Sequence, residues 1–147
     1  MFHRLLVPTD FSSSAASALT TVREHFPDAS VRLLHIISAQ RVAAFYSDSF
    51  TSSVDAADAR RNLEQSALEQ LRELVLGDEE CVAVVGQPAE TILAQAETWR
   101  PDLIVMGTHG RTGLAHFLNG SVTEEVVRHA RLPVLVVHQG DGATGGE

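Results

Sequence analysis

The sequence predicts an α/β protein in which a parallel sheet carries helices on both faces. Short apolar segments alternate with helical patterns along the chain, in the order β-α-β-α-β-α-β-α-β. The apolar segments, such as Leu103–Met106, are continuously hydrophobic, as is typical of parallel strands covered on both sides. With 147 residues, 44% of them hydrophobic, the chain suits one doubly wound, Rossmann-like domain with five strands.

The first strand and helix are marked by proline and by turn residues. Leu5–Val7 is expected to form a strand that Pro8 ends, and Ser12 stands at the start of a helix over Ser13–Phe26. Pro27 ends this helix, and Val31–Ile37 follows as the second strand. The apolar face of the helix consists of Ala15, Ala18, Leu19 and Val22.

A polar segment separates the second strand from a long helix. Ser38–Ser53 is expected to be a long loop because it ends in a cluster of serines and other polar residues. Asp55–Leu76 reads as an amphipathic helix that ends at Gly77. Its buried stripe is expected to contain Leu63, Ala67, Leu71, Leu74 and Val75.

The second half of the chain continues the alternation of strands and helices. Pro88 suits the first position of a helix that reaches Trp99, and Pro101 lies just beyond that helix. We expect residues 1–139 to form the domain and residues 140–147, which are rich in glycine, to form a flexible tail. The remaining elements are strands over Cys81–Val85, Leu103–Met106 and Pro133–Val137 and a helix over Ser121–His129.

Composition limits the class of protein. The formal net charge is -8, and eleven arginines but no lysine oppose nineteen acidic residues, which argues against non-specific binding to nucleic acid. No apolar run approaches the roughly 20 residues that span a membrane, and the N-terminus does not resemble a signal peptide. The single cysteine, Cys81, is expected to be a buried structural thiol. A cytoplasmic protein fits these observations.

A glycine-rich segment follows the fourth strand. Glycines stand at positions 107, 110, 113 and 120, and Ser121 begins the next helix. Glycine lets a ligand approach the backbone closely, and amide groups at a helix start attract phosphate. The usual phosphate motifs do not match, because a P-loop needs a lysine and no G-x-G-x-x-G follows the first strand.

The ligand of an open parallel sheet lies where the direction of winding reverses. If the strand order is 3-2-1-4-5, which is an assumption at this point, the reversal falls between the first and fourth strands. The residues that leave those strands are Pro8-Thr9-Asp10 and Gly107-Thr108-His109-Gly110. A carboxylate on one side suits ribose hydroxyls or an adenine amino group, and amides on the other side suit phosphates.

These segments together resemble the universal stress protein family over nearly the whole length. The match runs from Leu6-Val7-Pro8-Thr9-Asp10 through Leu33-Leu34-His35-Ile36 and Gly86-Gln87-Pro88 to Asp102–Leu114 and Leu132–Val137. The family's nucleotide motif, G-x2-G-x9-G-[ST], is intact at Gly107, Gly110, Gly120 and Ser121. The resemblance implies the ATP-binding branch, the 3-2-1-4-5 sheet and a homodimer formed through Pro133–Val137.

The resemblance also implies roles for individual residues. Asp10 would hold the adenosine, the backbone near Ile36 would border the adenine, and the motif glycines with Ser121 and Val122 would line ribose and phosphates. The basic residues common between the second and third glycines are replaced here by Ala115–Asn119, which leaves the preference between ATP and ADP or AMP open. The expected set is Pro8, Thr9, Asp10, Ile36, Met106, Gly107, His109, Gly110, Arg111, Gly120, Ser121 and Val122.

Several of these residues have simpler interpretations. Asp10 can cap the first helix, Gly110 can be an ordinary turn glycine, and Ser121 can serve as an N-cap as well as a ligand contact. Arg111 suits a charged phosphate clamp and a solvated surface position equally well. No paired histidine or cysteine accompanies His109, so we expect no metal site there.

The sequence thus predicts an ATP-binding stress or signalling module that acts as a homodimer, with ADP or AMP as other ligands and Mg²⁺ as a possible companion of ATP. Efficient catalysis is not expected, because no lysine and no evident general base are available for phosphoryl transfer. Two alternatives remain. One is a slow ATPase or self-phosphorylating protein that uses Ser121 or a serine of residues 47–53, and the other is a structural dimer without nucleotide.

Overall fold

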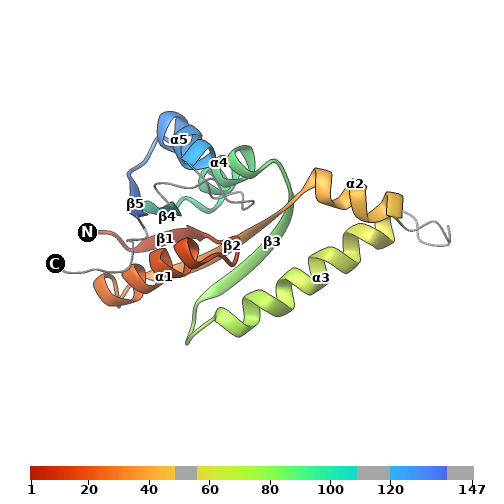
Figure 1. The fold of residues 1–147 in the computed structure, drawn as a ribbon. Coiled ribbons are helices and arrows are strands. Elements are labelled where there is room, and N and C mark those ends of the chain that lie inside the picture. Colours follow the sequence, from red (N-terminus) through yellow and green to blue (C-terminus); the bar gives the residue numbers. More distant parts are fainter. Residues whose placement is uncertain (49–55, 109–119, 139–147) are drawn as a thin grey trace.

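The fold is a five-stranded parallel sheet in the order β3-β2-β1-β4-β5, which confirms the predicted architecture and strand order (Figure 1). The structure is a computed structural model that describes residues 1–48, 56–108 and 120–138. No helix in these ranges has both the length and the apolar character to cross a bilayer. The strands are β1 (Arg4–Pro8), β2 (Ser30–Ser38), β3 (Glu80–Gly86), β4 (Leu103–Thr108) and β5 (Val134–His138). The helices are α1 (Ser13–His25), α2 (Ala39–Asp48), α3 (Ala56–Leu74), α4 (Pro88–Trp99) and α5 (Gly120–His129).

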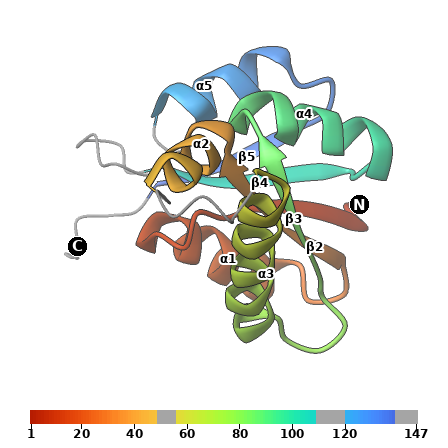
Figure 2. The same ribbon diagram turned by 90° about the vertical axis from the view of Figure 1, so that its right-hand side faces the viewer.

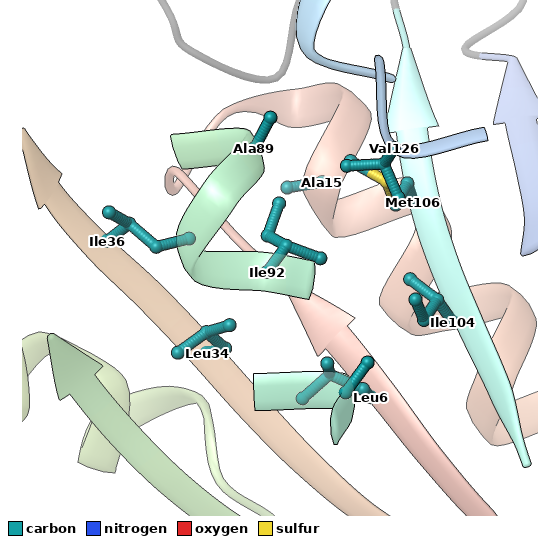
Figure 3. Close-up of a cluster of buried hydrophobic side chains, with 10 residues drawn as sticks. Leu6, Ala15, Leu34, Ile36, Ala89, Ile92, Ile104, Met106 and Val126 are labelled. Carbon is teal, nitrogen blue, oxygen red and sulfur yellow. The ribbon is translucent and has the colours of Figure 1, made fainter. Parts of the chain in front are cut away.

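Helices cover both faces of the sheet, as Figure 2 shows: α4 and α5 lie on one side, and α1 and α3 on the other. A cluster of buried side chains fills the first layer, where Ile92 of α4 and Val126 of α5 meet Leu6, Ile104 and other strand residues (Figure 3). A second cluster joins Val22 of α1 and Leu71 of α3 to the opposite sheet face. The burial of each such side chain stabilises the fold by roughly 1.5–3 kcal/mol.

The predicted loop over Ser38–Ser53 is wrong for residues 39–48, which form α2. The polar composition of this segment is typical of a loop and hid the start of a helix. Ser38 marks that start, since its Oγ accepts a hydrogen bond from the Arg41 amide at 3.0 Å, as an N-cap serine does. Alanines at positions 39, 43 and 44 then favour the helix. α2 continues directly from β2 and extends past the sheet beside α3 (Figure 1). Residues 49–53 lie outside the described ranges.

The strands are longer or shifted at their ends by one or two residues relative to the prediction, and two of these differences concern the candidate site. β4 extends to Thr108, so Gly107 lies within a strand, and β5 covers Val134–His138. The reason is the parallel pairing of these strands, in which Gly107 stands opposite Val137 and Thr108 opposite His138. Cys81 is only partly buried in β3, rather than fully buried as predicted.

An ion pair fixes α1 to the turn between α3 and β3. Arg23 donates from Nε and Nη2 to the two carboxylate oxygens of Glu79 at 3.0 and 2.7 Å, and Nη2 also donates to the Leu74 carbonyl at 2.6 Å. Burial alone would raise the pKa of the Glu79 carboxyl. The Arg23 guanidinium and the Leu76 amide outweigh burial and hold this pKa below its ordinary value of 4.5.

We expect Glu79→Gln to lower the free energy of unfolding by about 1–2 kcal/mol at neutral pH, because partly buried Arg23 loses its charged acceptor. The folded pKa lies below the unfolded one, so this stabilisation is complete above the unfolded value and is lost as pH falls through the folded value. Urea unfolding of both proteins should therefore converge at acid pH. The matched control is Glu64→Gln, since Glu64 pairs with Arg60 at 3.5 Å on an outer position of α3. An equal loss in the two variants at neutral pH would contradict this account.

Candidate functional site

The carboxyl ends of β1 and β4 lie side by side at one edge of the sheet. The two strands are parallel and adjacent, with Leu5 opposite Leu103 and Leu6 opposite Ile104. Neighbouring strands are about 4.8 Å apart, so the residues that follow Pro8 lie next to the last residues of β4. The sheet winds in opposite directions on the two sides of this pair, which is the position where ligands of such sheets bind. The reversal of winding therefore falls between β1 and β4, as predicted.

Asp10 follows β1 at this edge and is largely buried, with 8% of its surface exposed. Its Oδ1 accepts a hydrogen bond from the Ser12 amide at 3.0 Å. The N-cap of α1 is Ser12, whose Oγ accepts from the Ala15 amide at 3.3 Å. The simpler interpretation of Asp10 as the helix cap is thus replaced by a role in shaping the turn that precedes the helix.

Phe11 has an unusual backbone in this turn. Its φ is 65°, in the left-handed region that residues with a Cβ rarely adopt. The Phe11 amide donates to Thr9 Oγ1 at 3.0 Å, and the Phe11 ring packs on the His35 ring with centroids 4.6 Å apart. Sequence reasoning missed this arrangement, because no local pattern indicates a left-handed phenylalanine or its contact with another strand.

His35 of β2 supports the turn from the neighbouring strand. The side chain is 5% exposed, and Nδ1 lies 2.9 Å from the Thr9 carbonyl oxygen. Burial is the main reason that the pKa of His35 lies below its ordinary value of 6.5. Arg41 also lowers this pKa, whereas the bond to Thr9 and the charge of Asp10 raise it. Burial therefore favours the neutral form of the His35 imidazole.

The start of α5 lies at the same edge of the sheet. β4, α5 and β5 form a parallel crossover, in which the helix runs back from the carboxyl end of β4 to the amino end of β5. Gly120, Ser121 and Val122 form the first turn of α5, where backbone amides point outward and the helix dipole is positive. Val122 packs against the core, and Ser121 is exposed.

Thr123 adds a feature that sequence reasoning did not find. Its side chain is 5% exposed, and its Oγ1 has no hydrogen-bond partner among the residues that the structure describes. A buried hydroxyl without a partner lowers the stability of the folded protein by roughly 1–3 kcal/mol. Helical side chains lean toward the N-terminus of their helix, so this hydroxyl belongs to the same helix start as the expected phosphate contacts.

Three expected ligand residues also have roles in packing. A Cβ on Gly107 would lie 2.0 Å from the Ser14 carbonyl oxygen of α1, so the close approach of α1 alone requires glycine there. The side chains of Ile36 and Met106 are 1% and 0% exposed and point into the cluster shown in Figure 3. Their side chains are thus core residues, and a ligand at this edge could meet only their backbone atoms.

His109, Gly110 and Arg111 lie outside the residues that the structure describes, as does the segment Ala115–Asn119. Their expected contacts with phosphate therefore stay predictions. The structure brings together Thr9 and Asp10, the end of β4 and, by the crossover, the start of α5. Within the described ranges, no three histidine, cysteine or acidic residues gather as a metal site would require.

A separate hollow of about 560 Å³ lies between the C-terminal ends of α4 and α5. Arg100 and Arg131 bring two positive charges to it. The Glu97 carboxylate and the C-terminal ends of the two helices, each helix end carrying about half a negative charge, offset them. The hollow is therefore not selective for an ion, and because both helices end there it lies away from the carboxyl ends of the strands.

Comparisons with known proteins agree with this fold. The model of the Universal stress protein family matches residues 1–138. Universal stress protein MJ0577 of Methanocaldococcus jannaschii is 33% identical over 93% of this chain and 95% of its own length. The solved structure of MJ0577 matches with a TM-score of 0.74 at 31% identity, covering 97% of this chain and 99% of that one. A universal stress protein family structure from Arabidopsis thaliana shares the fold with a TM-score of 0.55 at 20% identity, over 95% and 93% of the two chains.

Proposed function

This chain belongs to the universal stress protein family, and on that premise we propose that it binds an adenine nucleotide, ATP in particular, between the ends of β1 and β4. The observation that carries the proposal is the buried carboxylate of Asp10 beside the end of β4, at the edge where α5 begins. The Arabidopsis thaliana structure that shares the fold is described with AMP bound, which is consistent with such a ligand.

The proposed contacts follow the chemistry of the residues that leave each of the two strands. Asp10 accepts from ribose or adenine donors, and the backbone of Pro8, Thr9, Ile36 and Met106 borders the nucleoside. The phosphates lie toward Gly107, His109, Gly110 and Arg111 and the α5 start at Gly120, Ser121 and Val122, where amides and the helix dipole favour negative charge. Because the chain has no lysine, Mg²⁺ carried by ATP would supply much of the neutralising charge.

In this proposal the nucleotide controls conformation or partner binding in a stress response, in the cytoplasm, rather than being consumed. Such control requires that the nucleotide bind two states of the protein with different affinity. Calorimetric titration with ATP, ADP and AMP tests binding and ranks the three ligands. Saturation at about a hundredfold excess over the dissociation constant should raise stability by roughly 2.7 kcal/mol. If none of the three nucleotides shifts thermal unfolding, the proposal is wrong.

Phosphate release separates a binding module from an enzyme. We expect purified protein to release phosphate from ATP far more slowly than about 1 s⁻¹, the lower end of common enzyme rates. A rate at or above that value, lost when Asp10 is replaced, would favour the ATPase alternative over the binding module.

We also propose a homodimer formed through β5, over Pro133–Val137. β5 is an edge strand that pairs only with β4 within the described sheet, and Leu135 is 36% exposed on it. An exposed apolar edge strand is a template for pairing with another chain.

Leu135→Arg is expected to weaken the dimer by about tenfold or more, because it places a charge on the pairing edge. Sedimentation velocity over a concentration series measures the change. The matched control is Leu76→Arg, since Leu76 is 58% exposed in the turn before β3, away from β5. If Leu135→Arg sediments like the control and the unaltered protein, the interface lies elsewhere.

A further inference from the structure

We propose that His35 is a positioning residue for the nucleotide: it holds the turn over Thr9–Phe11 in the shape that presents Asp10 to the ligand. This role rests on the proposed function, since it concerns the same site. His35 comes from β2, whereas the turn follows β1, so the support crosses from one strand to the next.

The turn needs support from outside itself. Phe11 adopts φ 65°, a left-handed conformation that is unfavourable for a residue with a Cβ. Two hydrogen bonds shape the turn locally, from the Phe11 amide to Thr9 Oγ1 and from the Ser12 amide to Asp10 Oδ1, each 3.0 Å long. Both bonds join residues two apart, so they set the curvature of the turn but not its position relative to the sheet.

His35 contacts the first and the last residue of this turn. A carbonyl oxygen can only accept, so Nδ1 of His35 carries a proton and donates it to Thr9 O at 2.9 Å. The imidazole also packs on the Phe11 ring at 4.6 Å, with 39° between the ring planes. The Thr9 amide also donates to the Leu34 carbonyl at 2.8 Å, so the backbone of β2 fixes the start of the turn. The His35 side chain adds a second contact at Thr9 and the contact at Phe11, on either side of Asp10.

The charges around His35 make this support sensitive to pH. Among the residues that the structure describes, Arg41 on α2 and Asp10 in the turn act on the imidazole through their charges. On the side of α3, a small cavity of about 20 Å³ beside His35 is lined by Leu63, Ser66, Ala67 and Gln70, none of which titrates. Protonation would place a buried cation near Arg41, so acid favours states in which the contacts with His35 are broken. Nucleotide affinity should then fall with decreasing pH.

The test compares His35→Ala and His35→Asn with a matched control. Asparagine retains a donor close to the Nδ1 position but has no ring and does not titrate. The control is His25→Asn, because His25 is exposed and its Nδ1 also lies 3.1 Å from a backbone carbonyl, that of Thr21. The affinity for ATP is measured at pH 7.5. The pH series uses adenosine instead, because adenosine has no phosphate group whose protonation would change with pH.

We expect His35→Ala to weaken ATP binding about tenfold, because apparent affinity falls with the fraction of molecules in the competent conformation. For adenosine, the unaltered protein should lose affinity as pH falls from about 7.5 to 5, and His35→Asn should show a flatter profile. His25→Asn should match the unaltered protein in both measurements. An ATP affinity of His35→Ala within twofold of the unaltered protein, or the same pH profile in His35→Asn, overturns the proposal.

Amide hydrogen exchange separates this proposal from the proposed function. If the unaltered protein binds no adenine nucleotide, the proposed function fails, and exchange still decides whether His35 holds the turn. Faster exchange at Phe11 and Ser12 in His35→Ala, with Val84 and Val126 unchanged, supports the role of His35. Unchanged exchange at Phe11 and Ser12 contradicts it. If His35→Ala does not fold, His35→Asn takes its place in this measurement.

Discussion

Gly107→Ala is expected to destabilise the protein by about 3 kcal/mol, at the upper end of the usual range for overpacking. The added Cβ would lie 2.0 Å from the Ser14 carbonyl oxygen and 2.5 Å from its carbon. Both are backbone atoms near the start of α1, so no side-chain rotation relieves the contact. Relief requires α1 to move away from β4, which would separate buried residues such as Ala18 and Val105.

Urea unfolding followed by circular dichroism and by Trp99 fluorescence measures this loss. Gly86→Ala is the matched control, because Gly86 likewise lies in the last part of a strand but its added Cβ would meet the Thr91 hydroxyl at 2.4 Å. That hydroxyl belongs to a side chain that can rotate, so we expect a loss of about 1 kcal/mol. Equal losses of unfolding free energy in the two variants would show that α1 does not pack against β4 as closely as described.

Asp10→Ala is expected to weaken ATP binding about a hundredfold. A hydrogen bond to a charged group is worth about 1.5–3 kcal/mol, and each 1.4 kcal/mol is a factor of ten in affinity. The carboxylate is mostly buried beside the end of β4, so a ligand bond to it would be shielded from water. Calorimetric titration at neutral pH gives the affinity directly.

Two further variants separate the ligand contact from the shape of the turn. Asp10→Asn retains an acceptor for the Ser12 amide, so it should retain the shape of the turn while losing the charge. Its affinity for ATP should lie between those of the unaltered protein and Asp10→Ala. Asp28→Ala makes the same change at an exposed turn position and should bind as the unaltered protein does. If Asp10→Ala binds ATP as tightly as Asp28→Ala, the nucleotide does not use this carboxylate.

The fold could be predicted because its signals are local and repeated. Continuous apolar strands, amphipathic helices and proline or glycine at their ends predicted every strand and four of the five helices. α2 was missed because a serine-rich stretch is typical of loops, and only the bond from the Arg41 amide to Ser38 shows where the helix begins. The strand order came from the family resemblance, since composition does not determine which strands are neighbours.

The candidate site was predictable in outline but not in its supporting contacts. The sequence places Asp10 and Gly107 at strand ends, and the parallel sheet then brings those ends together. The bond between Thr9 and His35 joins residues 26 apart in the chain, and the packing of Gly107 against Ser14 depends on how closely α1 approaches β4. Neither contact has a local signature, because each depends on the three-dimensional arrangement of separate elements.

The packing of Gly107 against α1 affects how related sequences can be interpreted. A glycine at this position would persist in a protein that had lost its ligand, because the first helix would still exclude any side chain. It is therefore a marker of ancestry rather than of ligand binding. If the proposed function holds, the aspartate that follows the first strand and the glycine and serine that open the last helix are better guides to adenylate binding in a diverged homologue.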